Sequence, residues 1–339
     1  MPKTKIICTL GPATDRPGVM AAMILAGMDV VRLNFSHGAM DEHARRIDVV
    51  RSLNKKMRTN IRILGDLEGF RIRVGHLRGG RPVEVKKGQS VWLVSLPFAG
   101  HGAVIPFDFS GPLNKIRPGQ SVFIDDGRIA LCVEKQKSHG LFTRVVVGGV
   151  IRERKGINLP DVSLGFQELT EADKDHTRFA AQHGLEYLAQ SFVRSGEDVE
   201  ALKTETARFR YKCRIIAKIE NREGIRNVDS IVRACEGVMV ARGDMGVSLP
   251  IYEVPLIQKK IILKCNRAKK FAITATQMLE SMVENRIPTR AEVSDIANAI
   301  LDGTDYVMLS AETAVGQNPV ACVDIMNKII VFTEKNRLK

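Results

Sequence analysis

Short, uninterrupted apolar stretches recur along the whole chain, and each of them ends in a polar or charged residue. Runs of this kind are typical of strands buried on both faces, which build parallel sheets. The eight stretches are 6–9, 30–34, 63–66, 187–191, 215–220, 238–244, 272–276 and 306–310. Most are separated by segments with helical spacing, at 17–26, 41–55, 195–209, 222–234, 252–268, 291–301 and 319–332. Strands alternating with helices predict an α/β fold, a (β/α)8 TIM barrel, whose functional residues gather at the carboxyl ends of the strands.

The part of the chain between Asp66 and Thr170 lacks helical spacing and differs from the rest. It carries strand-like stretches separated by turn signals, at 83–85, 91–94, 122–124, 129–133 and 142–147. A barrel takes about 250 residues, so a chain of 339 residues leaves room for one small extra domain. We expect barrel segments at 1–73 and 156–339, interrupted after the third strand by an all-β lid domain at 74–155. A hinged lid over the active-site face is favoured, and a decorative insertion is the alternative.

The charge balance narrows the choice of partner. With 51 Lys and Arg against 38 Asp and Glu, the net charge of +13 suits nucleic acid, a membrane surface or phosphorylated small molecules. Basic residues are spread along the chain without a long block and aromatic residues make up only 5%, which disfavours nucleic acid. The six cysteines lack the C-x-x-C spacing of a zinc site. No long uncharged apolar run or signal core is present, so we expect no membrane span and a cytoplasmic location.

Two neighbouring strand ends supply carboxylates beside a lysine. Lys218 and Glu220 lie on the same side of one strand because side chains alternate, and the next stretch ends in Gly243 and Asp244. Two carboxylates form a hard-oxygen site suited to Mg²⁺ or Mn²⁺, and a glycine lets a ligand approach the backbone. Lys218 would stabilise negative charge on a phosphoryl or enolate oxygen. The alternative is a structural Lys–Glu ion pair at the barrel rim.

The second strand directs further polar side chains toward one side. Arg32, Asn34 and Ser36 recur at a period of two, and Asp66 ends the adjacent strand. Arginine suits a phosphate, whereas amide and hydroxyl oxygens suit a monovalent cation. Thr276 places a hydroxyl at another strand end. A solvated loop with a surface arginine, and a turn role for Asp66, are the alternatives.

Taken together, these and other segments resemble the pyruvate kinase family. The matching segments follow the family's order over nearly the whole chain, at 3–6, 9–12, 32–38, 125–127, 155–160, 218–221, 239–244, 276–282 and 288–292. The resemblance implies transfer of a phosphoryl group from phosphoenolpyruvate to ADP, followed by protonation of the enolpyruvate. Its products are pyruvate and ATP.

The resemblance also implies roles residue by residue. The implied substrate contacts are Arg32, Lys218, Gly243, Asp244 and Thr276. Of these, Arg32 and Lys218 would bind the transferring phosphoryl group, and Thr276 would help place the water that delivers a proton. Glu220 and Asp244 would hold Mg²⁺ or Mn²⁺. The implied nucleotide contacts on the lid and its hinges are Arg73, Lys155 and Asp126.

One departure from the family concerns potassium. The oxygens that K⁺ would take are those of Asn34, Ser36, Asp66 and the backbone carbonyl of Leu67. Phe70 replaces the family's usual proline, and Arg71 stands where members have Glu or Lys. Members with Glu resemble K⁺-dependent enzymes, whereas those with Lys are K⁺-independent because a fixed charge substitutes for the ion. Arg71 is permanently charged, so we predict activity without a K⁺ requirement.

A second departure concerns the end of the chain. The family usually continues with a C-terminal α/β domain that carries an effector site, whereas this sequence stops at Lys339. We therefore expect no effector control through that domain, and a homo-oligomer would form through barrel contacts. Two other functions remain open. One is a metal-dependent enzyme that acts on phosphoenolpyruvate or a related 2-oxo acid with a different acceptor, and the other is a noncatalytic binding protein on the same barrel.

Overall fold

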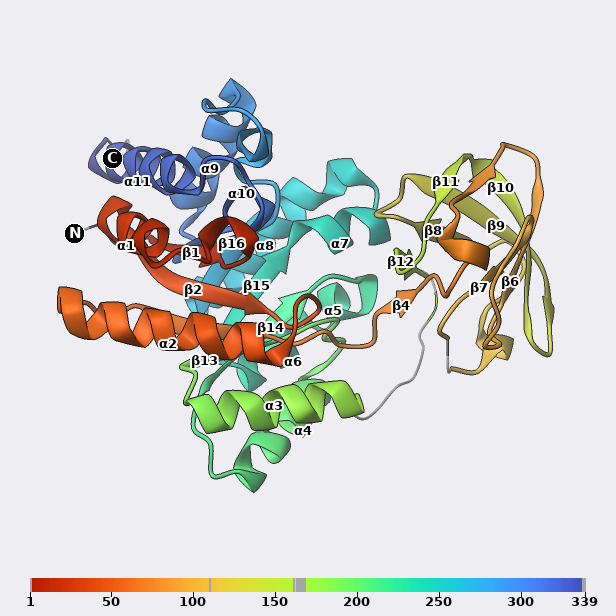
Figure 1. Ribbon diagram of the computed structural model, residues 1–339, viewed down its shortest axis with the longest axis horizontal. Helices are drawn as coiled ribbons and strands as arrows, with labels where there is room; N and C mark the ends of the chain where they lie inside the picture. The colour runs from red at the N-terminus through yellow and green to blue at the C-terminus, as the bar shows by residue number, and fades with distance from the viewer. Residues whose placement is uncertain (1, 110, 161, 163–168, 337–339) are drawn as a thin grey trace.

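Eight parallel strands close into a barrel in a computed structural model that describes residues 2–109, 111–160, 162 and 169–336 (Figure 1). Neighbouring strands follow the order β1, β17, β16, β15, β14, β13, β3, β2 and back to β1. The barrel strands are β1 (Lys5–Thr9), β2 (Met28–Asn34), β3 (Arg62–Asp66), β13 (Tyr187–Gln190), β14 (Arg214–Ile219), β15 (Gly237–Ala241), β16 (Phe271–Ala275) and β17 (Tyr306–Leu309). All eight predicted strands and the TIM-barrel fold are confirmed.

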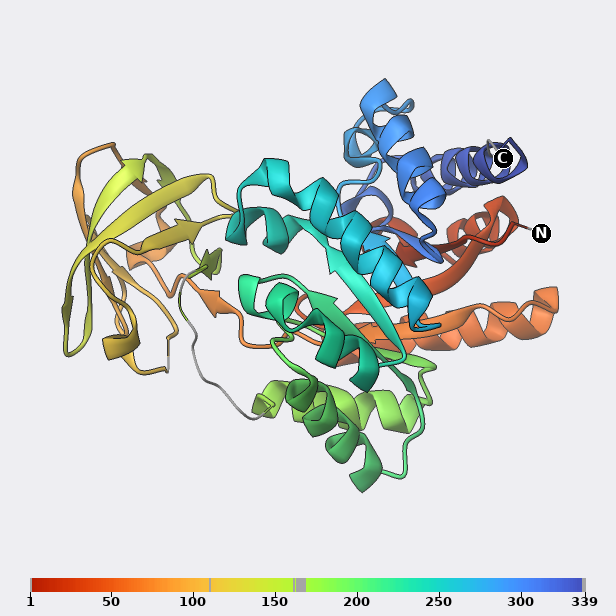
Figure 2. The same ribbon diagram turned by 180° about the vertical axis from the view of Figure 1, so that it is seen from behind.

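Helices surround this barrel (Figures 1 and 2). They are α1 (Pro17–Ala26), α2 (Met40–Met57), α3 (Glu171–His183), α4 (Gly196–Arg208), α5 (Arg222–Arg226), α6 (Val228–Ala234), α7 (Arg242–Ser248), α8 (Val254–Arg267), α9 (Arg290–Asp302), α10 (Ala311–Ala314) and α11 (Pro319–Lys335). The single helix predicted over 222–234 is wrong, since it divides into α5 and α6 at Asn227. Asn227 has non-helical backbone angles, and its Nδ2 donates to the Arg194 carbonyl at 2.8 Å. A capping box formed by Thr289 and Glu292 begins α9.

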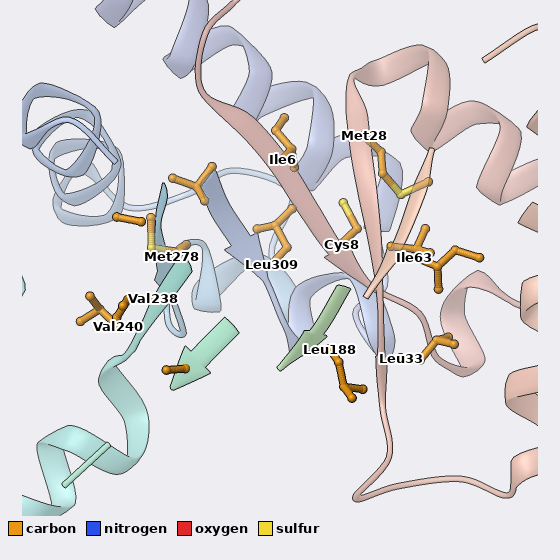
Figure 3. Close-up of a cluster of buried hydrophobic side chains, with 14 of the residues drawn as sticks. Ile6, Cys8, Met28, Leu33, Ile63, Leu188, Val238, Val240, Met278 and Leu309 are labelled. Atoms are coloured by element: carbon orange, nitrogen blue, oxygen red, sulfur yellow. The ribbon is translucent and has the colours of Figure 1, made fainter. Parts of the chain in front are cut away.

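Alternate residues of the barrel strands face two different cores. Ile7, Val30 and Leu64 belong to a cluster made of strand residues alone, which fills the barrel interior. Their neighbours point outward and pack against the helices, as Ile6, Cys8, Leu33 and Ile63 do in Figure 3. This parity decides which side chains at the strand ends can meet above the interior.

The predicted inserted domain forms a separate body beyond one end of the barrel (Figure 1). Its main sheet has seven strands in the order β4, β12, β8, β9, β10, β6, β7, and β11 pairs with β5 in a second sheet. Their bounds are β4 (Ile72–Arg73), β5 (Val83–Val85), β6 (Ser90–Val94), β7 (Val104–Pro106), β8 (Ser121–Ile124), β9 (Ile129–Lys137), β10 (Gly140–Val147), β11 (Gly149–Ile151) and β12 (Gly156–Asn158). A hydrophobic cluster of its own fills this domain. The neighbouring strands β4 and β12 flank the predicted span 74–155 and lie at the two connections to the barrel.

Both ends of the described chain lie at the end of the barrel remote from the inserted domain (Figures 1 and 2). The backbone N–H of Lys3 donates to Glu334 at 2.8 Å, and that of Thr4 donates to the same carboxylate at 2.7 Å. The final helix α11 is thereby tied to the first strand. None of the helices in the described part of the chain is long and apolar enough to cross a membrane.

Candidate active site

Three charged side chains rise from the barrel strands above the interior core. Arg32, Asp66 and Lys218 each stand two positions after an interior residue of their strand, namely Val30, Leu64 and Ile216. Strand alternation therefore directs all three toward the barrel axis at the carboxyl ends of β2, β3 and β14. The sequence-predicted residues of three separate strands meet at one place.

These side chains form a continuous chain of charges. Arg32 Nε donates to Asp66 Oδ2 at 2.7 Å, and Lys218 Nζ lies 3.2 Å from Asp66 Oδ1. Lys218 Nζ also lies 3.1 Å from Glu220 Oε1. The side chains of Asp66 and Glu220 are each only 1% exposed, and that of Lys218 is 11% exposed. Burial at this level requires that the charges compensate one another, and here two cations alternate with two carboxylates.

Charge compensation keeps both Asp66 and Lys218 in their charged forms. Burial would raise the pKa of Asp66, but Lys218 and Arg32 outweigh burial and hold that pKa below its ordinary value. Burial would lower the pKa of Lys218, yet Asp66 and Glu220 raise it above its ordinary value. Asp66 is therefore a carboxylate and Lys218 an ammonium.

Glu220 and Asp244 form the candidate divalent-metal site. Burial raises the pKa of Glu220, and Asp244 raises it further, while Lys218 and the Phe192 N–H oppose the shift. Asp244 forms no ion pair within the described chain, and its Oδ1 lies 3.4 Å from Asn158 Nδ2. Neighbouring carboxylates that repel one another and are incompletely neutralised fit a hard divalent cation. No group of three His, Cys, Asp or Glu with metal-ligand placement occurs among the described residues, so substrate and water oxygens would complete the shell.

The prediction that the strand beginning at Val238 runs to Asp244 is wrong at its carboxyl end. β15 stops at Ala241, and Arg242–Ser248 forms α7, so Gly243 and Asp244 lie in the first turn of a helix. Gly243 lies close to the next strand end, since a Cβ atom at this position would come 3.1 Å from Thr276 Cγ2. This close approach brings Thr276, the implied substrate contact on the next strand, beside the metal ligand's helix.

Arg242 fixes the backbone that carries Thr276. Its guanidinium donates to the Thr276 carbonyl at 2.6 Å and to the Ala275 carbonyl at 3.2 Å, and it pairs with Asp295 at 2.6 Å. Thr276 and Gln277 have φ values of 76° and 54°, a left-handed conformation that is costly for residues with a side chain. The arginine therefore stabilises a strained loop whose Thr276 side chain lies against Gly243 of α7.

Two of the residues assigned to the nucleotide lie at the connections to the inserted domain and the third lies in a turn of that domain, and each has a charged partner. Arg73 is held by Glu68 at 2.5 Å, and Lys155 Nζ lies 2.8 Å from Asp125. Asp126, in the turn between β8 and β9, lies 3.8 Å from Arg71 and remains largely exposed. Arg73 and Lys155 thus lie in the hinge region and Asp126 in a turn of the inserted domain, and the ion pairs of all three among the described residues are made outside the Lys218 network.

Three of the four residues predicted to supply oxygens for K⁺, namely Asn34, Asp66 and Leu67, already have partners for those oxygens. Asn34 Oδ1 accepts from the Ser36 N–H at 3.2 Å, and the Leu67 carbonyl accepts from Ser191 Oγ at 2.7 Å. Asp66 contacts the two cations described above. Arg71 points toward the inserted domain, although its charge contributes to lowering the pKa of His37, after burial and Arg73. Its positive field therefore reaches the loop that begins at Asn34.

A cleft opens between the hinge strands and the barrel loops. Phe70, Asn158 and Phe192 are among its lining residues. It adjoins the carboxylate pair, because the Phe192 N–H donates to Glu220 at 2.6 Å and Asn158 contacts Asp244. A ligand in this cleft can reach the metal site from the side of the inserted domain.

Sequence reasoning missed three residues of the site. Ser191 accepts a hydrogen bond from Lys218 Nζ at 2.6 Å, and Thr9 Oγ1 accepts one from Arg32 at 3.0 Å. Both continue the inward parity of their strands, so extending the alternation by one position would have found them. Arg242 contacts chiefly backbone carbonyls, for which the sequence carries no signal.

Comparison with known proteins places this geometry in a family. The family model described as pyruvate kinase, barrel domain, matches residues 1–323. This chain belongs to the pyruvate kinase family. It is 44% identical to a pyruvate kinase of Thermococcus litoralis, an alignment that covers 99% of this chain and 70% of that relative. It is likewise 44% identical to a pyruvate kinase of Geobacillus stearothermophilus, with 98% of this chain and 57% of the relative covered.

A solved structure agrees with the sequence relatives. A crystal structure of a pyruvate kinase from Cryptosporidium parvum superposes with a TM-score of 0.94 at 37% identity, covering 99% of this chain and 70% of that one. The chain therefore matches the barrel and the inserted domain of this family and spans between 56% and 72% of the length of its curated relatives. The resemblance read from the motifs is confirmed at the level of family and fold.

Proposed function

We propose that this protein transfers a phosphoryl group from phosphoenolpyruvate to ADP, giving pyruvate and ATP, with Mg²⁺ or Mn²⁺ as cofactor. The observation that carries the proposal is the convergence of Arg32 and Lys218 with the carboxylates of Glu220 and Asp244 above the barrel interior. Cations for a phosphoryl group and ligands for a divalent ion thus adjoin one another. The chain's membership of the pyruvate kinase family and the names of its relatives support the same reaction.

The chain's own residues suit a reaction that needs charge neutralisation and positioning. Arg32 and Lys218 would hold the phosphoryl group and stabilise negative charge as it develops on the enolate oxygen. Phosphoryl transfer needs no nucleophilic side chain, and this network consists of cations and carboxylates. Glu220 and Asp244 would hold the divalent ion, which neutralises substrate charge when bound. Thr276 would contact the substrate and orient the water that supplies a proton.

Nucleotide binding would involve the hinge of the inserted domain. Arg73 lies in β4 and Lys155 directly precedes β12, at the two connections between this domain and the barrel. Asp126 occupies a turn of the same domain. Phosphates that bridge Arg73 and Lys155 would draw the two connections together, so the inserted domain would act as a lid over the cleft. Retention of these residues favours ADP over a different acceptor.

Potassium independence is a further part of the proposal. Asp66 is already neutralised by Arg32 and Lys218, and the positive field of Arg71 extends to the loop of Asn34 and Ser36. A permanent guanidinium would supply there the charge that K⁺ supplies in other members. Potassium would then be tolerated without being required.

Phosphorus-31 NMR tests the acceptor directly. Purified protein is mixed with phosphoenolpyruvate, Mg²⁺ and ADP, and the loss of the donor signal is compared with the gain of the ATP γ-phosphate signal. Equal loss and gain are expected. Donor loss without ATP would favour hydrolysis or another acceptor. Saturable Mg²⁺-dependent donor binding without turnover would favour the noncatalytic alternative, and salt-sensitive binding to RNA without turnover would favour a nucleic-acid role.

A further inference from the structure

Arg73, proposed above for the nucleotide phosphates, already donates a hydrogen bond from each of its three side-chain nitrogens. Its Nε and Nη2 donate to Glu68 Oε1 at 3.0 Å and 2.5 Å, and its Nη1 donates to the Arg154 carbonyl at 3.2 Å. The side chain of Arg73 is only 10% exposed and that of Glu68 is 25% exposed. A phosphate oxygen that binds this largely buried guanidinium therefore has to share it with the Glu68 carboxylate, which already accepts from two of its nitrogens.

The Arg73–Glu68 ion pair also crosses the hinge. Glu68 follows β3 on the barrel side, where the next residue, Gly69, donates its N–H to Asp173 of α3 at 3.2 Å. Arg73 lies in β4, the edge strand of the inserted sheet, opposite Gly156 of β12. One partner is thus anchored to the barrel and the other to the inserted domain.

We infer that Glu68 competes with the nucleotide for Arg73 and makes the site selective for metal-complexed over metal-free nucleoside diphosphate. This inference rests on the proposed function. A metal-free diphosphate brings several negative charges beside the Glu68 carboxylate, which repels them while holding the arginine that would bind them. A divalent ion on the diphosphate reduces that repulsion and offers the displaced carboxylate a cation in exchange for Arg73.

The other hinge cation imposes a weaker constraint. Lys155 pairs with Asp125 through a single contact of 2.8 Å, and its side chain is 41% exposed. A flexible, partly solvated ammonium can turn to a phosphate at small cost, whereas the buried guanidinium of Arg73 is held by paired donors. The selectivity is therefore assigned to Glu68.

Calorimetric titration of Glu68→Gln with ADP tests this inference. Glutamine keeps the length and one acceptor oxygen but removes the charge. We expect metal-free ADP, measured with EDTA present, to bind roughly fivefold more tightly to this variant than to the unmodified protein. The gain should shrink when Mg²⁺ is in excess, and the KM for ADP should fall while the KM for phosphoenolpyruvate stays unchanged. Damage to the fold would weaken binding, so a gain in affinity cannot arise from it.

Two further variants complete the experiment. Glu134→Gln removes the charge from a similar Arg–Glu pair on the inserted sheet, with Arg144 at 2.7 Å, and should leave ADP affinity unchanged. Glu68→Asp keeps the charge and should show no gain. Unchanged or weaker binding of metal-free ADP to a folded Glu68→Gln variant would overturn the inference while leaving the nucleotide site intact. If neither protein binds ADP with or without Mg²⁺, the inference and the proposed ADP-dependent function both fail.

Discussion

Arg71 is the residue on which the proposed potassium independence depends. Its side chain lies 3.8 Å from Asp126 and is 26% exposed, so it is attached to the lid by a loose ion pair. Its charge nevertheless acts on His37, in the loop that carries the predicted K⁺ oxygens. Closing the lid would carry the Asp126 partner with it, and the guanidinium would remain as a fixed cation at the hinge.

Replacing Arg71 with glutamine should create a K⁺ requirement. Without its charge, we expect the rate of pyruvate formation in K⁺-free buffer to fall at least tenfold, and added K⁺ to restore most of it. Steady-state rates across a KCl series, with ionic strength held constant by a tetraalkylammonium salt, measure this directly. Arg78→Gln, an exposed arginine in the inserted domain, is the matched control and should behave like the unmodified protein. A strict K⁺ requirement before any substitution would contradict the assignment.

At the scale of elements, the loop after β16 depends on a residue of the neighbouring helix. Arg242 of α7 holds three consecutive carbonyls of residues 275–277 while two of those residues are left-handed. Each such residue costs on the order of 1–3 kcal/mol, so the loop keeps its shape only while these bonds persist. The position of the Thr276 hydroxyl is therefore set from outside its own strand.

Arg242→Met should uncouple this loop. We expect kcat to fall by about a hundredfold because Thr276 loses its position, while the KM for ADP changes little because the hinge is untouched. Asp295→Asn weakens only the ion pair at 2.6 Å and leaves the carbonyl bonds, so its effect on kcat should be much smaller. An unchanged kcat in a folded Arg242→Met variant would show that Thr276 needs no such support.

Helix α2 contributes a pH-dependent term to stability through His43. Burial and the charge of Arg46 lower its pKa below the ordinary 6.5, although the His37 carbonyl and Glu42 oppose the shift. Its Nε2 donates to the His37 carbonyl at 2.9 Å, and its Nδ1 has no partner in the described structure, which suits a neutral ring. As the pH falls through 6.5, the unfolded chain binds a proton that the folded His43 excludes, so stability decreases below that pH.

Urea unfolding at about pH 7.5 and about pH 5.5 tests this term. The loss of unfolding free energy between these conditions should be smaller in His43→Gln than in the unmodified protein. His37 and His176 also have lowered pKa values, so part of the pH dependence should remain. His101→Gln, at an exposed position of the inserted domain, should leave the difference unaltered. Equal pH dependence in His43→Gln would rule out this contribution.

The elements also show where sequence reasoning succeeds and where it stops. The barrel strands are continuous apolar runs, and the same alternation that buries Val30 and Ile216 aims Arg32 and Lys218 at one point. By contrast, β4 and β12 have two and three residues, too few to show a period, and they are defined by their pairing, β4 with β12 and β12 also with β8. The partners of Arg242 are backbone carbonyls, which depend on loop conformation and leave no pattern in the sequence.

At the scale of the whole molecule, two separate cores meet at a narrow hinge. The barrel and the inserted domain have their own hydrophobic clusters, and the short strands β4 and β12 lie between the two bodies (Figures 1 and 2). The charge network of Lys218 lies on the barrel, whereas Arg73 and Lys155 lie at the connections. Donor chemistry and nucleotide binding are thus divided between two bodies, and lid closure would bring them together.

Pyruvate formation by the purified protein tests the central claim most directly. The assay supplies phosphoenolpyruvate, ADP and Mg²⁺, and compares the unmodified protein with Lys218→Met, which removes the ammonium between Asp66 and Glu220. We predict turnover by the unmodified protein that requires both ADP and Mg²⁺, and a loss of at least roughly a thousandfold in the folded variant. Equal turnover by the two proteins, or none by the unmodified protein with all three components present, would contradict the proposed function.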